Sequence, residues 1–283
     1  AVRCGQAMIM SATNPASTAY AADHTTREKR TSTMAKLGTA NSMGMILGPA
    51  VSGALAIFGL LAPLYFAASL TAFAALLVWW QLPPTPPEQL VSREMRIRLR
   101  FTDPRLRVYL LSAVGLFVGF SGIQQTLGFQ LQDKLALTGI ATAQMTGAAL
   151  MVSASFTFLI QVTVMQRLQL QPMQFVKLGL LSLLFGASII ASFETFSVLA
   201  IGMAFIGTGL GLSMPAISAG ASLAVDPAEQ GGAAGLVVAC PAIGFVVGPV
   251  TAGALYQING PLAPLFSATV FFMVLVTLVI KDR

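Results

Sequence analysis

Long apolar segments follow one another along this chain, separated by short polar stretches. An α-helix needs roughly 20 mostly apolar residues to cross the hydrocarbon core of a bilayer. Nine segments are of about that length, and we expect a membrane-spanning helix in each: residues 3–22, 34–58, 62–82, 107–131, 142–165, 177–193, 196–222, 233–258 and 262–280. The pattern therefore predicts an all-α integral membrane protein.

One pattern of glycine and proline occurs twice, in the second and in the eighth of these segments. The two copies are Gly44, Gly48, Pro49 and Gly53, and, 200 residues later, Gly244, Gly248, Pro249 and Gly253. A period of this length is far beyond the ~20–50 residues of soluble repeat proteins, whereas transporters are often built from repeated sets of membrane helices. We therefore interpret the chain as two related helical bundles.

The same residues indicate a mechanical role. Gly44 and Gly48 lie four residues apart on one helix face, which allows a neighbouring backbone to approach, and Pro49 offers no N–H to the preceding turn and bends the helix. We expect both copies to lie at the interface between the bundles and to act as a hinge there. Ordinary packing of small residues is the alternative interpretation.

A proline-rich stretch that begins at Pro83 and runs into an arginine-rich segment marks the predicted boundary between the bundles. We expect a partial N-terminal bundle of three helices over residues 1–82, a cytoplasmic linker over 83–106, and a C-terminal bundle of six helices over 107–283. Because the C-terminal bundle has six predicted helices and the related N-terminal bundle has only three, we expect three further helices upstream of Ala1.

Composition and charge agree with a bilayer, since 55% of the residues are hydrophobic and only 9% are charged. Of the 16 Lys and Arg residues, 14 lie in loops on one side of the predicted helices. By the positive-inside rule that side is the cytoplasm, and the C-terminus lies there too. The net charge of +6 does not indicate nucleic acid, because no basic face interleaved with aromatic residues accompanies it.

The sequence gives no support to an enzyme. Its one histidine, His24, lies in a loop, and Cys4 and Cys240 belong to different segments, so neither a metal cluster nor a Cys/His nucleophile pair is predicted. The glycines from Gly202 to Gly211 lie within an apolar helix rather than after a strand, which favours close helix packing over a phosphate-binding loop. We expect no catalytic residue, no metal and no cofactor.

Two motifs carry a resemblance to a known family. The run from Arg3 through Gln6 to Ala7 resembles the fourth-helix motif of the major facilitator superfamily, with Ala7 in place of the usual glycine. The run from Gly44 to Gly53 is similar to the fifth-helix signature of the drug/proton antiporter branch, with Ser52 in place of one glycine. The resemblance covers the whole chain, as helices four to twelve, and implies the two-bundle fold with an incomplete N-terminal bundle.

The resemblance also implies site residues. In antiporters the arginine that matches Arg3 assists proton relay, and Gln6, one turn away, faces the same cavity. Snorkelling of Arg3 to the membrane surface is the alternative. Asp133 and the chain's other acidic residues fall at predicted helix ends or in loops, so a coupling carboxylate belongs either to the missing helices or to no part of this carrier.

Amide side chains within the predicted helices are the candidates for a substrate path, namely Asn14, Asn41, Gln124, Gln125, Gln130, Gln144 and Gln161. Buried amides are costly unless they are paired, so they indicate either a water-filled cavity or hydrogen bonds between helices. Gln124 and Gln125 are the stronger pair because glycines at 115, 119 and 122 precede them in the same helix. Residues 124–128 also resemble the seventh-helix pattern of sugar porters.

These observations together favour a secondary active transporter that works by alternating access and exports drug-like or metabolite substrates in exchange for protons. The alternatives are a sugar or metabolite uptake carrier of the same superfamily, and a membrane receptor or scaffold that does not transport. We expect a multi-pass protein of the bacterial inner membrane, monomeric, whose partners are a small-molecule substrate, protons and the lipid bilayer.

Overall fold

The computed structural model describes residues 61–81, 99–168, 170–226 and 229–281, together with isolated positions between residues 17 and 59. Apart from those isolated positions, the predicted helices over 3–22 and 34–58 lie outside the described residues, as does most of the predicted linker. The chain divides into two compact units, residues 1–49 and 50–283, and each helix presented below belongs to the second.

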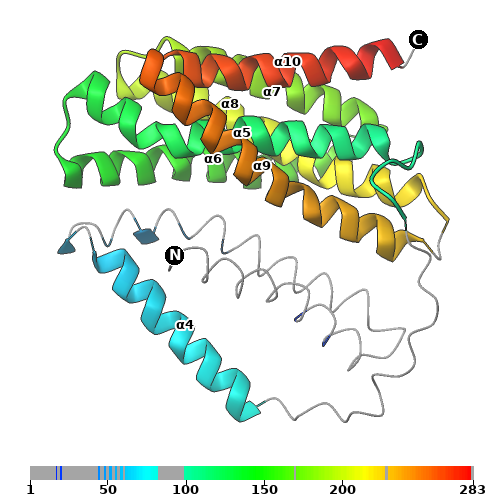
Figure 1. Ribbon diagram of the computed structural model, residues 1–283, viewed down its shortest axis with the longest axis horizontal. Helices are drawn as coiled ribbons and strands as arrows, with labels where there is room; N and C mark the ends of the chain where they lie inside the picture. Colours follow the sequence, from blue (N-terminus) through cyan, green and yellow to red (C-terminus); the bar gives the residue numbers. More distant parts are fainter. Residues whose placement is uncertain are drawn as a thin grey trace. The chain divides into compact units, whose positions relative to one another are not determined.

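Seven helices are described, and all are long and apolar enough to cross a membrane (Figure 1). They are α4 (Ala62–Gln81), α5 (Arg107–Leu135), α6 (Gly139–Arg167), α7 (Pro172–Ala191), α8 (Phe196–Leu223), α9 (Gln230–Ile258) and α10 (Leu262–Lys281). Each coincides with one of the predicted segments, and the described residues contain no strand. The predicted fold class, an all-α integral membrane protein, is confirmed.

Two helix boundaries differ from the prediction for local reasons. Helix α7 begins five residues earlier than expected, because Pro172 fits its first turn and Gln171 and Gln174 form a reciprocal capping box. Helix α5 continues four residues beyond Leu131 and ends at Ala136, which adopts the left-handed conformation at φ 49°. Polar residues in that last turn made the apolar segment end earlier than the helix.

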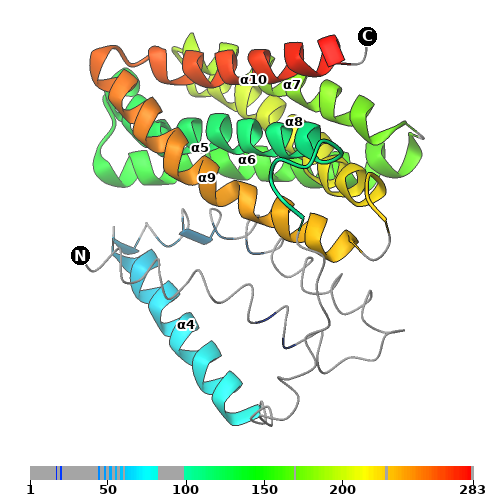
Figure 2. The ribbon, with the colours of Figure 1, turned by 45° about the vertical axis from the view of Figure 1, so that its right-hand side comes forward.

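Helices α5 to α10 pack together, with α7 against α8 and α5 against α9 as the most extensive pairs. Helix α8 also packs against α6, and α10 packs against α7 and α5. Figures 1 and 2 show α9 lying across α5 although their sequences are about a hundred residues apart. Helix α4 buries no residue and is described by itself.

Glycines allow α8 to approach a helix on each side. A Cβ atom on Gly186 of α7 would lie 2.8 Å from the carbonyl oxygen of Gly202, and one on Gly209 would lie 2.6 Å from that of Gly179. A Cβ atom on Gly207 would collide with the backbone of Ser153 in α6. The glycine-rich run in this segment therefore serves close packing, as its apolar context predicted.

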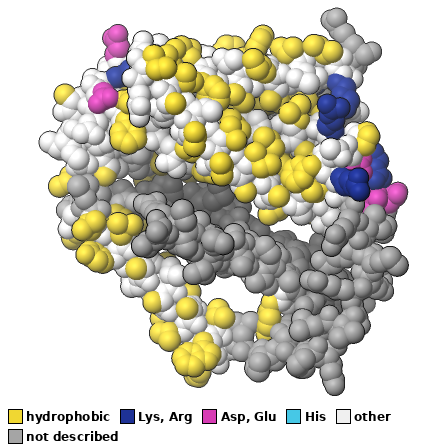
Figure 3. All heavy atoms as spheres, viewed as in Figure 1, with side chains coloured by type: hydrophobic (Ala, Val, Ile, Leu, Met, Phe, Trp, Pro, Cys, Tyr) yellow, Lys and Arg dark blue, Asp and Glu magenta, His cyan; other side chains and the backbone are white. Residues whose placement is uncertain are grey.

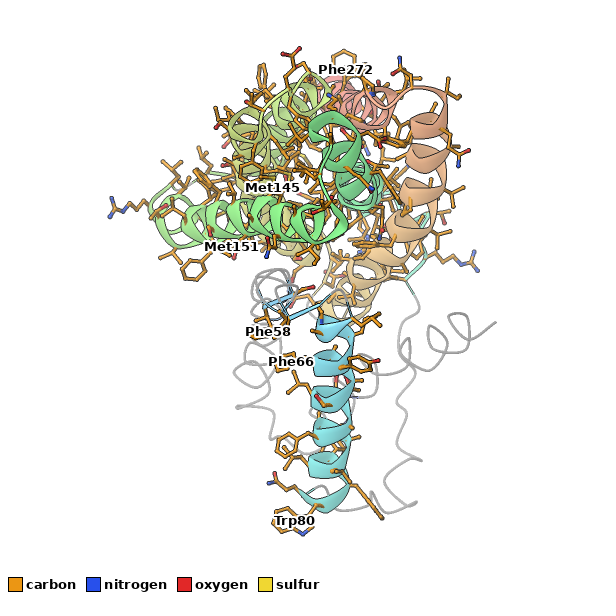
Figure 4. The ribbon with its side chains drawn as sticks, turned by 90° about the vertical axis from the view of Figure 1, so that its left-hand side faces the viewer. Phe58, Phe66, Trp80, Met145, Met151 and Phe272 are labelled. Carbon is orange, nitrogen blue, oxygen red and sulfur yellow. The ribbon has the colours of Figure 1, made fainter. Side chains whose placement is uncertain are left out.

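Apolar side chains cover the surface of the helices, which is the burial pattern of a chain that faces lipid. Phe66 and Trp80 project from α4, and Met151 and Phe272 lie at the surfaces of α6 and α10 (Figure 4). On the face drawn in Figure 3, the charged side chains of the described residues gather at two ends of the bundle, with hydrophobic side chains between them. A bilayer accounts for this division.

Candidate functional site

The second copy of the Gly-Pro pattern lies on the face of α9 that meets α5. The hydroxyl of Ser121 donates a hydrogen bond to the carbonyl oxygen of Gly244 at 2.8 Å. A Cβ atom on Gly248 would collide with the Ser121 hydroxyl and the Val118 carbonyl oxygen, and one on Gly122 would lie 3.0 Å from the Cβ of Ala252. The glycines thus place two helix backbones in contact.

Our sequence interpretation placed this pattern at the interface between two bundles. Among the described residues, Gly244 and Gly248 contact α5, and nothing described tests a contact with the N-terminal helices. Gly253 meets no atom that a Cβ would touch, and Pro249 lies within α9. A hinge role between bundles stays a prediction.

For the first copy, Gly44 and Gly48 are exposed helical positions, whereas Pro49 and Gly53 lie outside the described residues. Arg3, Gln6, Asn14 and Asn41 lie outside them as well. The predicted proton relay and the N-terminal part of the substrate path therefore stay predictions.

Helix α5 leaves one face open near its C-terminal end. Most of its residues are buried, but Gln125, Phe129 and Asp133, which follow one another at intervals of four, are exposed. Side chains at that spacing lie one above another on a helix. Gln124 is half-buried, so of the two predicted amides it is Gln125 that belongs to the open face.

Tyr256 of α9 joins this face to the neighbouring helix. Its ring centroid lies 6.1 Å from that of Phe129, with the ring planes inclined at 40°. Its hydroxyl donates a hydrogen bond to Oδ2 of Asp133. An amide, an aromatic pair and a carboxylate therefore lie in succession along the open end of α5.

A chain of hydrogen bonds runs along the buried side of the same helix end. Thr126 donates from Oγ1 to the carbonyl oxygen of Gly122 at 2.9 Å, and Nε2 of Gln130 donates to that same Oγ1 at 3.1 Å. Gln130 is 1% exposed, and its Oε1 has no hydrogen-bond partner. The only proton of the Thr126 hydroxyl is already used, so Gln130 must donate to it, and its free atom is an acceptor.

Lys134 is the charged residue next to Asp133, but it points to another helix. Its Nζ donates to the carbonyl oxygens of Ala191 at 3.2 Å and Phe193 at 2.9 Å, and lies 4.3 Å from the centre of the Phe193 ring. Carbonyl groups at the C-terminal end of α7 carry partial negative charge and favour a cation. The Lys134 ammonium group is thus held at the end of α7.

These groups surround a pocket of about 200 Å³. We call it the α5–α9 pocket, and its lining residues are Gln130, Asp133, Lys134, Tyr256, Gly260 and Pro261. The sequence analysis included Gln130 among the amides of a substrate path but did not select Asp133 or Tyr256 as site residues. The spacing of Gln125, Phe129 and Asp133 was the available signal, and it was missed because the helix was ended at residue 131.

The opposite end of α5 carries an ion cluster. Arg105 donates from Nη1 to Oε2 of Glu229 at 2.8 Å and from Nη2 to Oδ2 of Asp103 at 3.1 Å. These bonds lower the pKa of both carboxyl groups below their usual values and raise the pKa of the guanidinium group. The cluster connects the segment that enters α5 with the residue that precedes α9.

No group of three or more His, Cys, Asp or Glu residues able to hold a metal ion occurs in the described part of the chain. Met145 is half-buried against the core and Met151 is exposed (Figure 4). The arrangement at the C-terminal end of α5 is therefore the described site with the richest chemistry.

Comparison with known proteins connects this architecture to a family. The family model of the Major Facilitator Superfamily matches residues 1–193. Among curated proteins, the chain is similar to multidrug resistance protein 2 of Bacillus subtilis, with 27% identity over 289 residues that cover 95% of this chain and 69% of the relative. It is also similar to multidrug resistance protein 1 of the same organism, with 25% identity, 94% of this chain and 68% of the relative.

Among solved structures, the human organic anion transporter MFSD10 (TETRAN) has a similar fold. The match has a TM-score of 0.64 and 23% identity, and it covers 93% of this chain and 66% of that protein. The chain thus spans about two thirds of the length of each of these three proteins.

Proposed function

The chain belongs to the major facilitator superfamily of membrane transporters, and from that premise we propose that it takes part in proton-coupled export of small drug-like or metabolite compounds by alternating access. Multi-pass membrane embedding and a small-molecule substrate follow from the family. Export is supported by the two Bacillus relatives, whose names describe multidrug resistance.

The observation that carries the proposal is the open face of α5. Gln125 offers both a donor and an acceptor, and the Phe129 and Tyr256 rings offer apolar and π surfaces. Asp133 adds a negative charge at the end of the same face. Amphipathic compounds, especially those that carry a positive charge, match this combination.

The remaining parts of the proposal rest on the predictions from the sequence. Arg3 and Gln6 assist proton movement, and the repeated Gly-Pro helices, with Gly48 and Pro49 in one and Gly248 in the other, change their packing as the carrier alternates. The protein acts in a bacterial inner membrane with its C-terminus in the cytoplasm. The ion cluster around Arg105 and the basic end of α10 at Lys281 then face inward.

Transport into liposomes tests the proposal. The protein is reconstituted with an imposed pH gradient, and movement of a lipophilic cationic dye is followed. We expect the dye to move against its own gradient only while protons run the opposite way, and Gln125→Ala to slow it several-fold. Ser218→Ala, an exposed position of α8, is the matched control.

Dye movement that ignores the proton gradient would reject proton coupling. No dye movement, combined with uptake of a labelled sugar that depends on Gln124 and Gln125, would favour the uptake carrier instead. That second candidate is supported by the exposure of the Gln125 amide on the open face.

A further inference from the structure

Helix α9 is packed into the bundle along most of its length but not at its C-terminal end. Its buried residues extend from the first turn onward and are Ala233, Cys240, Gly244, Gly248 and Ala252. None of residues 253–258, here called the tip of α9, is buried. The tip is therefore the part of α9 that packing holds least.

The start and the middle of α9 are held against α5. Arg105, just before α5, donates from both Nη atoms to the carboxylate of Glu229, at 2.8 and 3.1 Å. Further along, a Cβ atom on Gly244 or Gly248 would collide with α5, so the two backbones touch there. The tip has one described side-chain hydrogen bond to α5, which is donated by Tyr256.

Pro249 marks a point where α9 can bend. Proline has no N–H, so the carbonyl oxygen of Phe245 lacks its usual helical partner, and helices bend at such sites. Gly253, one turn later, has nothing within 4 Å of a Cβ position. Pro241 interrupts α9 as well, but it lies between the two levels that are held against α5. A bend at Pro249 therefore displaces mainly the tip.

The α5–α9 pocket gives the tip room to move. It has a volume of about 200 Å³ and lies between Tyr256 of the tip and the C-terminal end of α5. On the α5 side, the Lys134 ammonium group donates to the carbonyl oxygens of Ala191 and Phe193. The end of α5 is thus anchored at the end of α7, and the tip of α9 is the wall of the pocket that is held less firmly.

Gln130 has a polar atom that the present position of the tip leaves without a partner. Its side chain lines the pocket but is only 1% exposed, and its Oε1 accepts no hydrogen bond. A buried acceptor without a partner is costly. Movement of the tip away from α5 would admit water to this oxygen and so offset the loss of the Tyr256 hydrogen bond.

We propose that the tip of α9 is a gate segment that swings about Pro249, with the hydrogen bond from Tyr256 to Asp133 as its latch. In the open position, water reaches Gln130 and the buried side of α5. This inference goes beyond the proposed export, because the rocking of two rigid bundles requires no movement of α9 relative to α5. Equilibrium measurements test it without a substrate or a gradient.

The first test is the reaction of single cysteines with a water-soluble maleimide, in nanodiscs and in a background without Cys4 and Cys240. Gln130→Cys is compared with Ser112→Cys, because these residues lie equally far from the end and the start of α5 and are 1% and 0% exposed. We expect Gln130→Cys to react and Ser112→Cys to stay unreactive. Tyr256→Phe should speed only the first reaction, by about three- to tenfold, the population change that one lost hydrogen bond gives.

A second measurement leaves the buried amide intact. Spin labels on Gln132→Cys and Gln257→Cys report the distance between α5 and the tip, and labels on Leu111→Cys and Val238→Cys report the distance between the same helices nearer their N-terminal ends. All four positions are exposed. We expect a broad distance distribution for the tip pair, which Tyr256→Phe shifts to longer distances. The control pair should give a narrow distribution that Tyr256→Phe does not change.

Either of two results would overturn the proposal. Equal reaction rates at Gln130→Cys and Ser112→Cys would show that the tip does not open over the buried side of α5. Distance distributions that Tyr256→Phe changes equally in both pairs, or in neither, would show that the Tyr256 hydrogen bond does not hold a movable tip.

Discussion

At the scale of single residues, Arg105 makes the stability of the bundle depend on pH. Its bonds lower the pKa of Asp103 and Glu229, so the native state favours their charged forms. The contribution of these two carboxylates to the free energy of unfolding is complete above the usual carboxyl pKa of about 4. It is lost as the pH falls through their lowered pKa values.

We therefore expect Arg105→Gln to lower the melting temperature at pH 7, and the difference from the unmodified protein to shrink progressively as the pH falls below about 4. A melting curve at each pH measures this, with Arg107→Gln as the control because the two described salt bridges do not include Arg107. A difference that grows on acidification would contradict the assigned direction.

Tyr256 offers a second test at this scale. Tyr256→Phe keeps the ring that faces Phe129 but removes the hydroxyl that donates to Asp133. We expect a loss of about 1 kcal/mol in the free energy of unfolding, the usual net value of such a bond. Tyr65→Phe, at a tyrosine of α4 that is 71% exposed, should change nothing. Equal unfolding of both variants in denaturant would show that the hydroxyl makes no net contribution.

The site residues show where prediction from sequence stopped. Gln125 was selected because an amide inside an apolar segment is unusual, and the structure places it on an open face. Asp133 was assigned to a helix end because the polar residues 132–134 close the apolar segment, although the helix continues through them. Tyr256 could not be selected, since its partner lies 123 residues away and no local pattern connects them.

At the scale of helices, the contact of α9 with α5 depends on which glycine is changed. Gly248→Ala would place a methyl group against the Ser121 hydroxyl and the Val118 backbone, neither of which is the far end of a flexible chain. We expect a loss of about 1–3 kcal/mol, the usual cost of overpacking. Gly253→Ala, on the same helix, meets nothing within 4 Å.

This control should be neutral or stabilising by up to about 1 kcal/mol, because alanine is the better helix former. Thermal unfolding in lipid measures both variants. Equal behaviour of the two alanine variants would contradict the close contact at Gly248.

The positions of the helices were predictable because a membrane-spanning helix requires an apolar segment of matching length in the sequence. Which helices pack against each other was not predictable from the sequence. The Gly-Pro pattern predicted that α9 packs closely against another helix, but glycine does not indicate which helix that is. In the structure it is α5. The start of α7 was also missed, since the pair Gln171 and Gln174 forms its capping box only once the turn exists.

At the scale of the whole molecule, the charge distribution predicts which side of the membrane each loop faces. We expect Thr195→Cys, between α7 and α8, to react with an impermeant maleimide in intact cells. Leu168→Cys, between α6 and α7, should react only after permeabilisation. Both substitutions are made in a background without Cys4 and Cys240. The reverse labelling pattern would invert the proposed orientation.

The family was predictable from the motif around Gly48 and is supported by the match to residues 1–193. Substrate and coupling were not predictable to the same depth. Arg3 and Gln6, the residues to which the resemblance assigns proton relay, lie outside the described part of the chain.

The packing of α7 against α8 has a consequence for biogenesis. Only residues 192–195 separate these helices, and their glycines bring the backbones together. Contacts between neighbours in sequence form quickly, whereas α5 finds α9 only after the intervening helices have been synthesised. A nascent chain that ends after α8 would thus contain a paired α7 and α8 but an α5 whose partner α9 is still missing. Membrane quality control would encounter this partly packed species.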